Sequence, residues 1–261
     1  MAASSPESAG TVTVDFHIAN DHFALGTQVT VPTGPLAESE LLPLVRALAD
    51  RVVHETAAAV ERTGRKISCQ KGCGACCCNL VAISEVEARR IAAVVEEMPE
   101  PRRSEIRRRF SEARQRLEKS GLLATLQRAD EWTGEEYGKL VGTYFRQRIS
   151  CPFLEDGACS IYDERPITCR EYLVVSSPKH CAEDDSRHVV QLKMLLPVFN
   201  ALARWQVKPP RHLMERVVPL ILAPEWAATH PAPPPTKNGP ELIEDLLTLL
   251  RRPVEGSPKG R

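Results

Sequence analysis

Nine cysteines stand out in this chain of 261 residues, and most of them fall in two short segments. They are Cys69, Cys73, Cys76, Cys77 and Cys78, then Cys151, Cys159 and Cys169, and finally Cys181. Thiolate sulfur is a preferred ligand of zinc, and four thiolates can also hold an iron–sulfur cluster. A single cysteine is usually a small buried apolar residue, but five within ten positions are not explained in that way. The pattern predicts a metal centre.

The spacing inside each segment limits which sulfurs can share one ion. Gly72, Gly74 and Gly157 lie between the cysteines and favour the tight turns that bring several sulfurs together. Adjacent side chains point in different directions, so residues 76–78 cannot all bind one metal. Either they serve two metals, or one or two of them are simply buried. For Cys78 we expect burial, because Cys77 already completes a four-cysteine pattern.

The two segments resemble a known family. The motif Cys69-x3-Cys73-x2-Cys76-Cys77, followed by CPFLEDGACSIYDERPITCREY, is similar to the YkgJ-type, or CxxCxxCC, cysteine-cluster proteins over about residues 66–182. That family is described as chelating zinc or iron, and it is related to flagellin lysine N-methylases, in which an iron–sulfur centre is implied. The third adjacent cysteine, Cys78, departs from the family's usual pair.

The resemblance implies both a ligand set and a cofactor. Its metal ligands map to Cys69, Cys73, Cys76, Cys77, Cys151, Cys159 and Cys169, with Cys181 as the eighth. The cofactor is Zn2+ or a [4Fe–4S] cluster, since ligand type alone does not separate the two. The resemblance assigns no reaction and no catalytic residue.

Basic residues accompany both cysteine segments, namely Lys66, Lys71, Arg165 and Arg170. Their charges would offset those of the thiolates. Arg165 and Arg170 could instead bind an anionic ligand. We expect Asp163 and Glu164 to neutralise these two arginines.

Charge and composition argue against several function classes. Lysine plus arginine and aspartate plus glutamate both number 34, so no overall field attracts nucleic acid or anionic lipid. We expect the basic stretch 102–116 to be the solvated face of a helix. No apolar run is long enough to span a membrane, and residues 1–10 lack the features of a secretory signal. We therefore expect a cytoplasmic protein with a metal ion as its partner, no membrane or nucleic-acid partner, and an unknown protein partner.

The elements that must position the cysteines follow from periodicity. Apolar residues alternate over 11–31 on both sides of Asn20-Asp21, which predicts a β-hairpin. Helical spacing runs over 36–62, 84–98, 102–119 and 135–149. Ser84 and Glu87 form a capping box at the start of the second of these helices. Further helices are expected over 189–205, from 210 to 221, and over 241–251.

The expected fold is mainly α with a small N-terminal β-hairpin, and its helices surround an irregular cysteine-rich metal-binding core. Residues 1–35 would be a hairpin extension, 36–230 a helical domain holding the core at 66–182, 231–240 a Pro-rich linker, and 241–261 a short helix with a disordered tail. Three functions are compatible with this organisation. They are a metal-binding protein of unassigned reaction, an iron–sulfur enzyme related to protein lysine N-methylases, and a zinc-stabilised interaction module.

Overall fold

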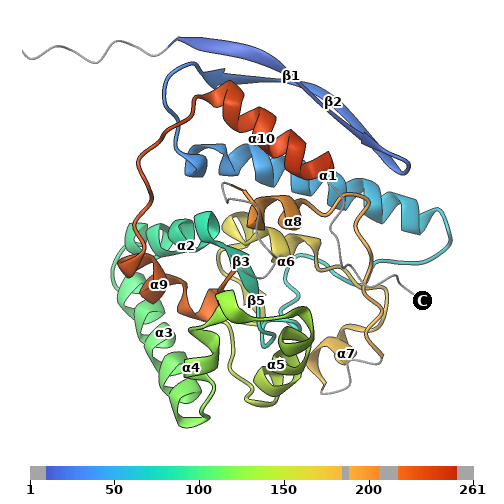
Figure 1. Cartoon of the computed structure of the whole chain (residues 1–261). Helices are drawn as coiled ribbons and strands as arrows, with labels where there is room; N and C mark the ends of the chain where they lie inside the picture. The colour runs from blue at the N-terminus through green and yellow to red at the C-terminus, as the bar shows by residue number, and fades with distance from the viewer. Residues whose placement is uncertain (1–9, 184–187, 206–216, 252–261) are drawn as a thin grey trace, which may run out of the picture.

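Helices form most of the structure, and a two-stranded hairpin lies across one end of them (Figure 1). The computed structural model describes residues 10–183, 188–205 and 217–251. It confirms the predicted fold class, mainly α with an N-terminal hairpin. Within these residues, no helix combines the length and the apolar character needed to cross a bilayer.

The described elements follow one another in this order: β1 (Thr11–Asn20), β2 (Phe23–Pro32), the 3-10 helix η1 (Glu38–Leu41), α1 (Leu42–Glu61), β3 (Ala82–Ser84), α2 (Glu85–Glu97), α3 (Arg102–Lys119), α4 (Leu123–Leu126), η2 (Ala129–Glu131), α5 (Gly134–Arg146), β4 (Leu154–Glu155), β5 (Ala158–Cys159), η3 (Tyr162–Glu164), α6 (Ile167–Glu171), α7 (Pro178–Ala182), α8 (Val198–Ala203), β6 (Val217–Pro219), η6 (Leu220–Leu222), α9 (Ala223–Thr229) and α10 (Gly239–Arg251).

The hairpin forms because apolar and polar residues alternate along both of its strands. β1 pairs antiparallel with β2 along its whole length. At the turn, the side-chain oxygen of Asn20 accepts hydrogen bonds from the backbone amides of His22 and Phe23 at 2.9 and 2.8 Å, which closes the loop without a glycine. The inner face buries Phe16, Ile18, Phe23 and Val31.

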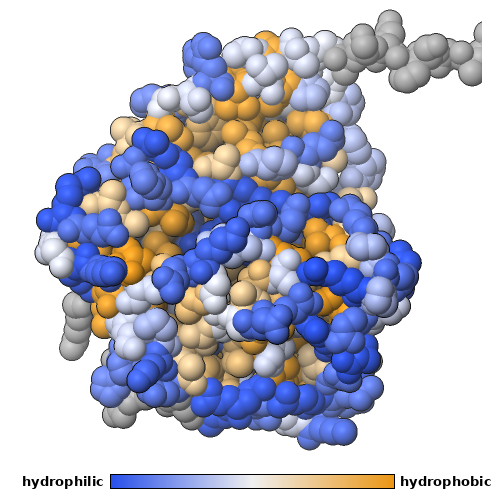
Figure 2. Space-filling model, turned by 180° about the vertical axis from the view of Figure 1, so that it is seen from behind, coloured by the Kyte–Doolittle hydropathy of each residue, from blue (hydrophilic) through white to orange (hydrophobic). Residues whose placement is uncertain are grey.

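Helix α10 lies beneath the hairpin and packs against both of its strands (Figure 1). A β-carbon at Gly239, its first residue, would collide with Val31 and with the carbonyl oxygen of Pro32, so the helix can approach β2 this closely only with glycine there. At its other end, Arg251 donates a hydrogen bond to the carbonyl of His17 at 2.7 Å. The hairpin, α1, α8 and α10 share one apolar core. When the molecule is seen from behind, apolar residues gather in its upper part (Figure 2).

Helices α2 and α3 enclose a second apolar cluster. The predicted capping box is present, because the Ser84 hydroxyl accepts from the amide of Glu87 and the Glu87 carboxylate accepts from the amide of Ser84. The predicted third helix, 102–119, is also confirmed. Phe153 and Ile161 are buried in this cluster between the two helices. Both belong to the second cysteine segment, so this core anchors that segment.

The predicted helix over 189–205 is wrong for its first half. Only α8 is helical, and it begins directly after Pro197. Residues 190–192 instead run alongside 173–175, where the Leu192 amide donates to the carbonyl of Leu173 at 2.8 Å. A helix through this segment would lose a hydrogen bond at Pro197, which has no backbone N–H group. The pairing with 173–175 provides hydrogen bonds for the backbone of 190–192 instead.

The helix expected from 210 to 221 is also corrected. Residues 217–219 form strand β6, which pairs antiparallel with β3, and 220–222 form a 3-10 turn. Val217 and Val218 are β-branched residues buried on both faces, and such residues pack well in a strand. Residues 210–216 lie outside the described part of the chain.

The hairpin core can be tested with Phe16→Ala. Phe16 is 1% exposed, so its removal leaves a cavity and should lower the free energy of unfolding by about 3–5 kcal/mol. Thr11→Ala, on the exposed edge of the same strand, should change it by less than about 0.5 kcal/mol. Urea denaturation followed by circular dichroism measures both variants, and equal midpoints would show that the hairpin is not part of the cooperative core.

Candidate metal centre

The two cysteine segments occupy loops that connect helices. The first lies between α1 and β3, and the second runs from the end of α5 through the small β4–β5 pair into α6. Cys181 belongs to α7 and is buried, whereas the other eight cysteines are half-buried. All nine are free thiols, so each of them is chemically available to a metal.

The two segments, although distant in sequence, lie side by side. The Cys151 amide donates a hydrogen bond to the carbonyl of Cys77 at 2.7 Å. Close by, a β-carbon at Gly74 would collide with the carbonyl of Gly157 and with the side chain of Leu154. Only a glycine at position 74 allows the backbones to come this close.

The first segment has a second contact, with the chain that follows α6. The Ser68 amide donates to the carbonyl of Val174 at 2.9 Å, and the Val174 amide donates to Cys69 Sγ at 3.3 Å. The Cys69 thiol in turn lies 3.8 Å from the carbonyl oxygen of Tyr172. The first segment is therefore held between the beginning and the end of the second.

Two of the glycines make the turns that their positions predicted. Gly72 has a φ of +93° and Gly157 a φ of +77°, in the left-handed region that side chains disfavour. Gly74, which was expected to be a turn residue, serves the close approach between segments instead.

Cys76 and Cys77 are coupled by a hydrogen bond between their thiols. This bond lowers the pKa of Cys76 to about 7 and raises the pKa of Cys77, because it stabilises a thiolate at Cys76 and keeps the proton on Cys77. The positive charge of Arg165 lowers the pKa of Cys76 further. The hydrogen bond and Arg165 thus favour the thiolate form at Cys76 over that at Cys77.

The charge interactions sort the other sulfurs into two groups around Cys76. Burial raises the pKa of Cys181 to about 11, and the nearby sulfurs that add to this shift are Cys76, Cys69 and Cys73. Cys69 likewise interacts with Cys76 and Cys73. We call Cys69, Cys73 and Cys181 the Cys69 group.

The second group also lies near Cys76. Burial raises the pKa of Cys151 to about 12 and that of Cys169 well above its ordinary value, and Cys159 and Cys76 contribute to both shifts. Cys77 interacts with Cys151 and Cys169. We call Cys77, Cys151, Cys159 and Cys169 the Cys151 group. Cys78 also lies near Cys151, whose pKa it helps to raise, and its Sγ lies 3.9 Å from the hydroxyl of Ser150.

A basic and aromatic cluster borders the sulfurs. The Arg165 guanidinium lies 4.1 Å and the Lys71 ammonium 5.1 Å from the centre of the Tyr162 ring. Both distances suit cation–π contacts. Arg165 lowers the pKa of Cys69, Cys76 and Cys159. Its charge thus acts on both groups, as expected for a residue that offsets thiolate charge.

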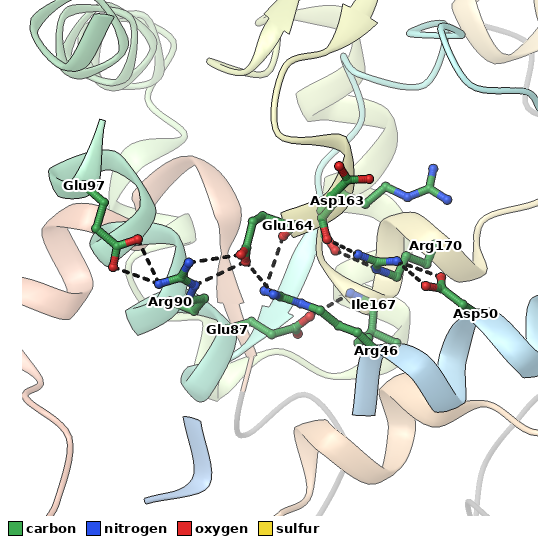
Figure 3. Close-up of polar contacts among 10 residues, drawn as sticks. Arg46, Asp50, Glu87, Arg90, Glu97, Asp163, Glu164, Ile167 and Arg170 are labelled. Atoms are coloured by element: carbon green, nitrogen blue, oxygen red, sulfur yellow. Dashed lines mark hydrogen bonds and ion pairs between the residues drawn. The ribbon is translucent and has the colours of Figure 1, made fainter. Parts of the chain in front are cut away.

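Arg170, next to Cys169, has partners other than those predicted. Its Nη1 lies 2.7 and 2.8 Å from the two carboxylate oxygens of Asp50 on α1 (Figure 3). Its Nε donates to the carbonyl of Arg165 at 3.0 Å, and Asp163 accepts only through its backbone carbonyl. With a side chain 5% exposed, Arg170 is committed to structure and not to an anionic ligand.

Two glutamates tie the second segment to α1 and α2. Glu164 binds Arg46 at 2.5 Å and Arg90 at 3.0 Å, so the prediction that it neutralises the adjacent arginines is wrong (Figure 3). The Glu87 carboxylate, which is buried, accepts from the amide of Ile167 at 2.7 Å. Burial raises the pKa of Glu87, while this bond and those from Ser84 oppose the rise.

Sequence reasoning missed these positioning contacts. Glu87 lies four residues before Ile91 on the apolar stripe of α2, so a buried carboxylate there could have been found from the helical pattern. Nothing in the sequence marks Asp50 as the partner of Arg170, because the two are 120 positions apart.

The donor chemistry fits a thiophilic metal, but the side chains are not yet arranged around one. Among the described residues, no three Cys, His, Asp or Glu side chains form a ready-made ion site. A metal ion would therefore require the sulfurs to rearrange around it. Thiolates in two groups beside cationic side chains match the ligands that zinc and iron–sulfur clusters take.

Gly74→Ala tests whether the close approach holds the centre together. The added methyl group collides with backbone of the second segment, so we expect a loss of about 1–3 kcal/mol in stability and a lower bound-metal content. Gly134→Ala is the matched control, because a β-carbon there meets nothing within 4 Å. Urea denaturation and elemental analysis measure the two variants. Normal stability and metal content in Gly74→Ala would contradict the placement of the segments.

Comparison with known proteins agrees with this geometry. No curated protein and no solved structure matches the chain. Residues 68–187, which contain both cysteine segments and Cys181, match a family described as "CxxCxxCC: Putative zinc- or iron-chelating domain". This confirms the resemblance drawn from the cysteine motifs. The chain is therefore similar to this cysteine-cluster family over residues 68–187, which are somewhat less than half of its length.

Proposed function

We propose that this protein binds two metal ions, each through four cysteine thiolates. The first site takes Cys69, Cys73, Cys76 and Cys181, and the second takes Cys77, Cys151, Cys159 and Cys169. These are the eight cysteines that the family motif implies as ligands. Cys78 is left out of both.

One observation supports the proposal: cysteines from distant parts of the chain lie near Cys76 and affect one another's pKa values. The backbone bond between Cys151 and Cys77 supports the second group, and the contacts of Cys69 with Tyr172 and Val174 support the first. Cys76 and Cys77 serve different ions in this arrangement, so metal binding separates two thiols that share a hydrogen bond in the metal-free chain.

Zinc is the metal that this arrangement favours. Structural zinc sites are closed by four tetrahedral ligands, and two groups of four thiolates supply two such sites. A single iron–sulfur cluster would use four thiolates and leave the others without a role. Each zinc with four thiolates carries a net negative charge, which Arg165 and Lys71 would partly balance. Free thiols in this number also favour a reducing, cytoplasmic location.

The role that follows is structural metal binding, or storage or sensing of metal, with no reaction assigned. An iron–sulfur enzyme related to lysine N-methylases would have a brown colour and would bind S-adenosylmethionine. A zinc-stabilised interaction module would share the metal site but would need a protein partner. We rank both below the two-zinc protein, because two zinc ions by themselves account for eight thiolates.

Anaerobic purification followed by elemental analysis tests the metal and its number. We expect a colourless protein with two zinc ions per chain. Broad visible absorption with iron and sulfide would contradict zinc, and one zinc per chain would contradict the two-site arrangement while leaving a thiolate centre in place.

Single substitutions test the assignment of ligands to sites. Cys73→Ser and Cys159→Ser should each remove one zinc, and each should lower stability strongly because zinc binding at such sites is worth about 10–16 kcal/mol of apparent free energy. Cys78→Ser, the matched control from the same run of cysteines, should keep both ions. Loss of metal in Cys78→Ser would mean that the ligand assignment is wrong.

Metal affinity should rise with pH. Burial raises the pKa of Cys151 to about 12 and that of Cys181 to about 11, so these thiols are protonated near neutral pH in the metal-free chain. Zinc binding must displace those protons, and a higher pH makes the displacement easier. Chelator competition between about pH 6 and 8 measures the apparent Kd. An affinity that does not change over this range would contradict thiolate ligation.

A further inference from the structure

A cavity of about 480 Å³ lies between η1, α1, α2 and the chain at 232–233. Its polar wall includes Glu38, Arg46, Arg89, Arg90 and Glu164, and its apolar wall includes Leu42, Pro43, Val86 and Ala93. This volume falls within the range of small-molecule sites, which combine apolar walls with a few polar groups. Neither the metal proposal nor the family description uses this cavity.

The guanidinium groups of the cavity already have carboxylate partners. Arg46 and Arg90 share Glu164 at 2.5 and 3.0 Å, and Arg90 also binds Glu97 at 2.9 Å (Figure 3). Arg89 lies 3.4 Å from Glu85, and its Nε donates to the carbonyl of His230 at 2.9 Å. An anionic ligand would have to displace these carboxylates, which makes anion binding unfavourable.

Glu38 differs from the other charged residues of the cavity. Among the described residues, its carboxyl group makes no hydrogen bond or ion pair, although the side chain is half-buried. Burial raises the pKa of Glu38 to about 7, and the more distant positive charges of Arg89 and Lys237 offset this only in part. Lys237 has a carboxylate partner of its own in Asp245 at 2.5 Å.

Carboxylates and guanidiniums are equal in number on the cavity wall. Glu38, Glu40 and Glu164 line it together with Arg46, Arg89 and Arg90, and Glu85 and Glu97 bind two of these arginines from outside, which leaves Glu38 as the carboxylate that an added cation can pair with. A cation with a carbon chain can use the apolar wall as well as Glu38.

We propose that this cavity binds a small organic cation, a primary amine or guanidine on a short aliphatic chain, with its charged end on the Glu38 carboxylate. The aliphatic part then packs against Leu42, Val86 and Ala93. The cation supplies the ion pair that Glu38 lacks in the free protein. Removal of the aliphatic chain from water adds roughly 0.8 kcal/mol for each buried methylene group.

Isothermal titration calorimetry of the full chain tests the proposal, with putrescine and agmatine as probes at about pH 8, where Glu38 is charged. The uncharged 1,4-butanediol and the anionic succinate serve as control ligands of similar length. We expect both amines to bind in the millimolar range or tighter and the two controls not to bind. No binding of either amine, or equal binding of succinate, would overturn the proposal.

Two variants assign the binding to the cavity. Glu38→Gln removes the charge and should weaken amine binding by about tenfold or more. Glu61→Gln, which changes an exposed glutamate at the end of α1, should bind the amines as the wild type does.

Ala93→Leu fills the apolar wall without changing charge and should also abolish binding. This variant covers the case that Glu38→Gln does not fold. Unchanged affinity in Glu38→Gln or in Ala93→Leu would place the amine elsewhere. The measurement does not involve the cysteines, so its failure would be distinct from failure of the metal proposal.

Discussion

Cysteine sulfurs gathered this closely cannot all carry negative charge unless a cation joins them. Burial removes water from the thiols, and each thiolate raises the pKa of its neighbours, as the shifts of Cys151, Cys169 and Cys181 show. In the metal-free chain, burial thus favours the protonated form of these three thiols, whereas the pKa of Cys76 is lowered. A divalent metal would replace several protons at once, and each thiolate would then be attracted to the metal ion. The loops around the sulfurs are irregular, and regular backbone pairing does not account for their stability. The need for a cation to balance the thiolate charges is therefore the central constraint.

The scaffold fixes the second cysteine segment through two buried side chains, Glu87 and Arg170. Glu87 holds the start of α6, and Asp50 holds Arg170 beside Cys169. Loss of one partner in a fully buried ion pair costs about 3–5 kcal/mol, whereas exposed pairs are worth about 0–1 kcal/mol. Glu87 and Arg170 are buried, although the side chain of Asp50 is 54% exposed. Their contacts therefore contribute more to stability than the many ion pairs on the surface of α3 do. The basic stretch of α3, whose Arg108 binds Glu105 and Glu112 on the same helix, acts as a solvated face.

Local patterns predicted the parts of the fold that local forces decide. Ser84 and Glu87 predicted the start of α2, and apolar spacing predicted α3. Both predictions succeeded because capping and amphipathic periodicity act within a few residues. The same reasoning failed at 190–192 and 217–219, where pairing with 173–175 and with β3 replaced the expected helices. The cysteine types and spacing indicated metal chemistry, but not that Cys151 lies on Cys77. A contact between residues so far apart depends on how α2, α3 and α5 fold back, and one sequence does not record that path.

The packing of α10 on the hairpin has a consequence for how the chain is made. β1 and β2 leave the ribosome first among the described elements, yet the face they bury is completed only by α10, the last one. Both cysteine segments and Cys181 emerge in between. During synthesis, both cysteine segments are therefore complete while the apolar side of the hairpin still lacks α10. The order of the elements along the chain thus leaves the hairpin with an uncovered apolar surface in the nascent protein until α10 has been made.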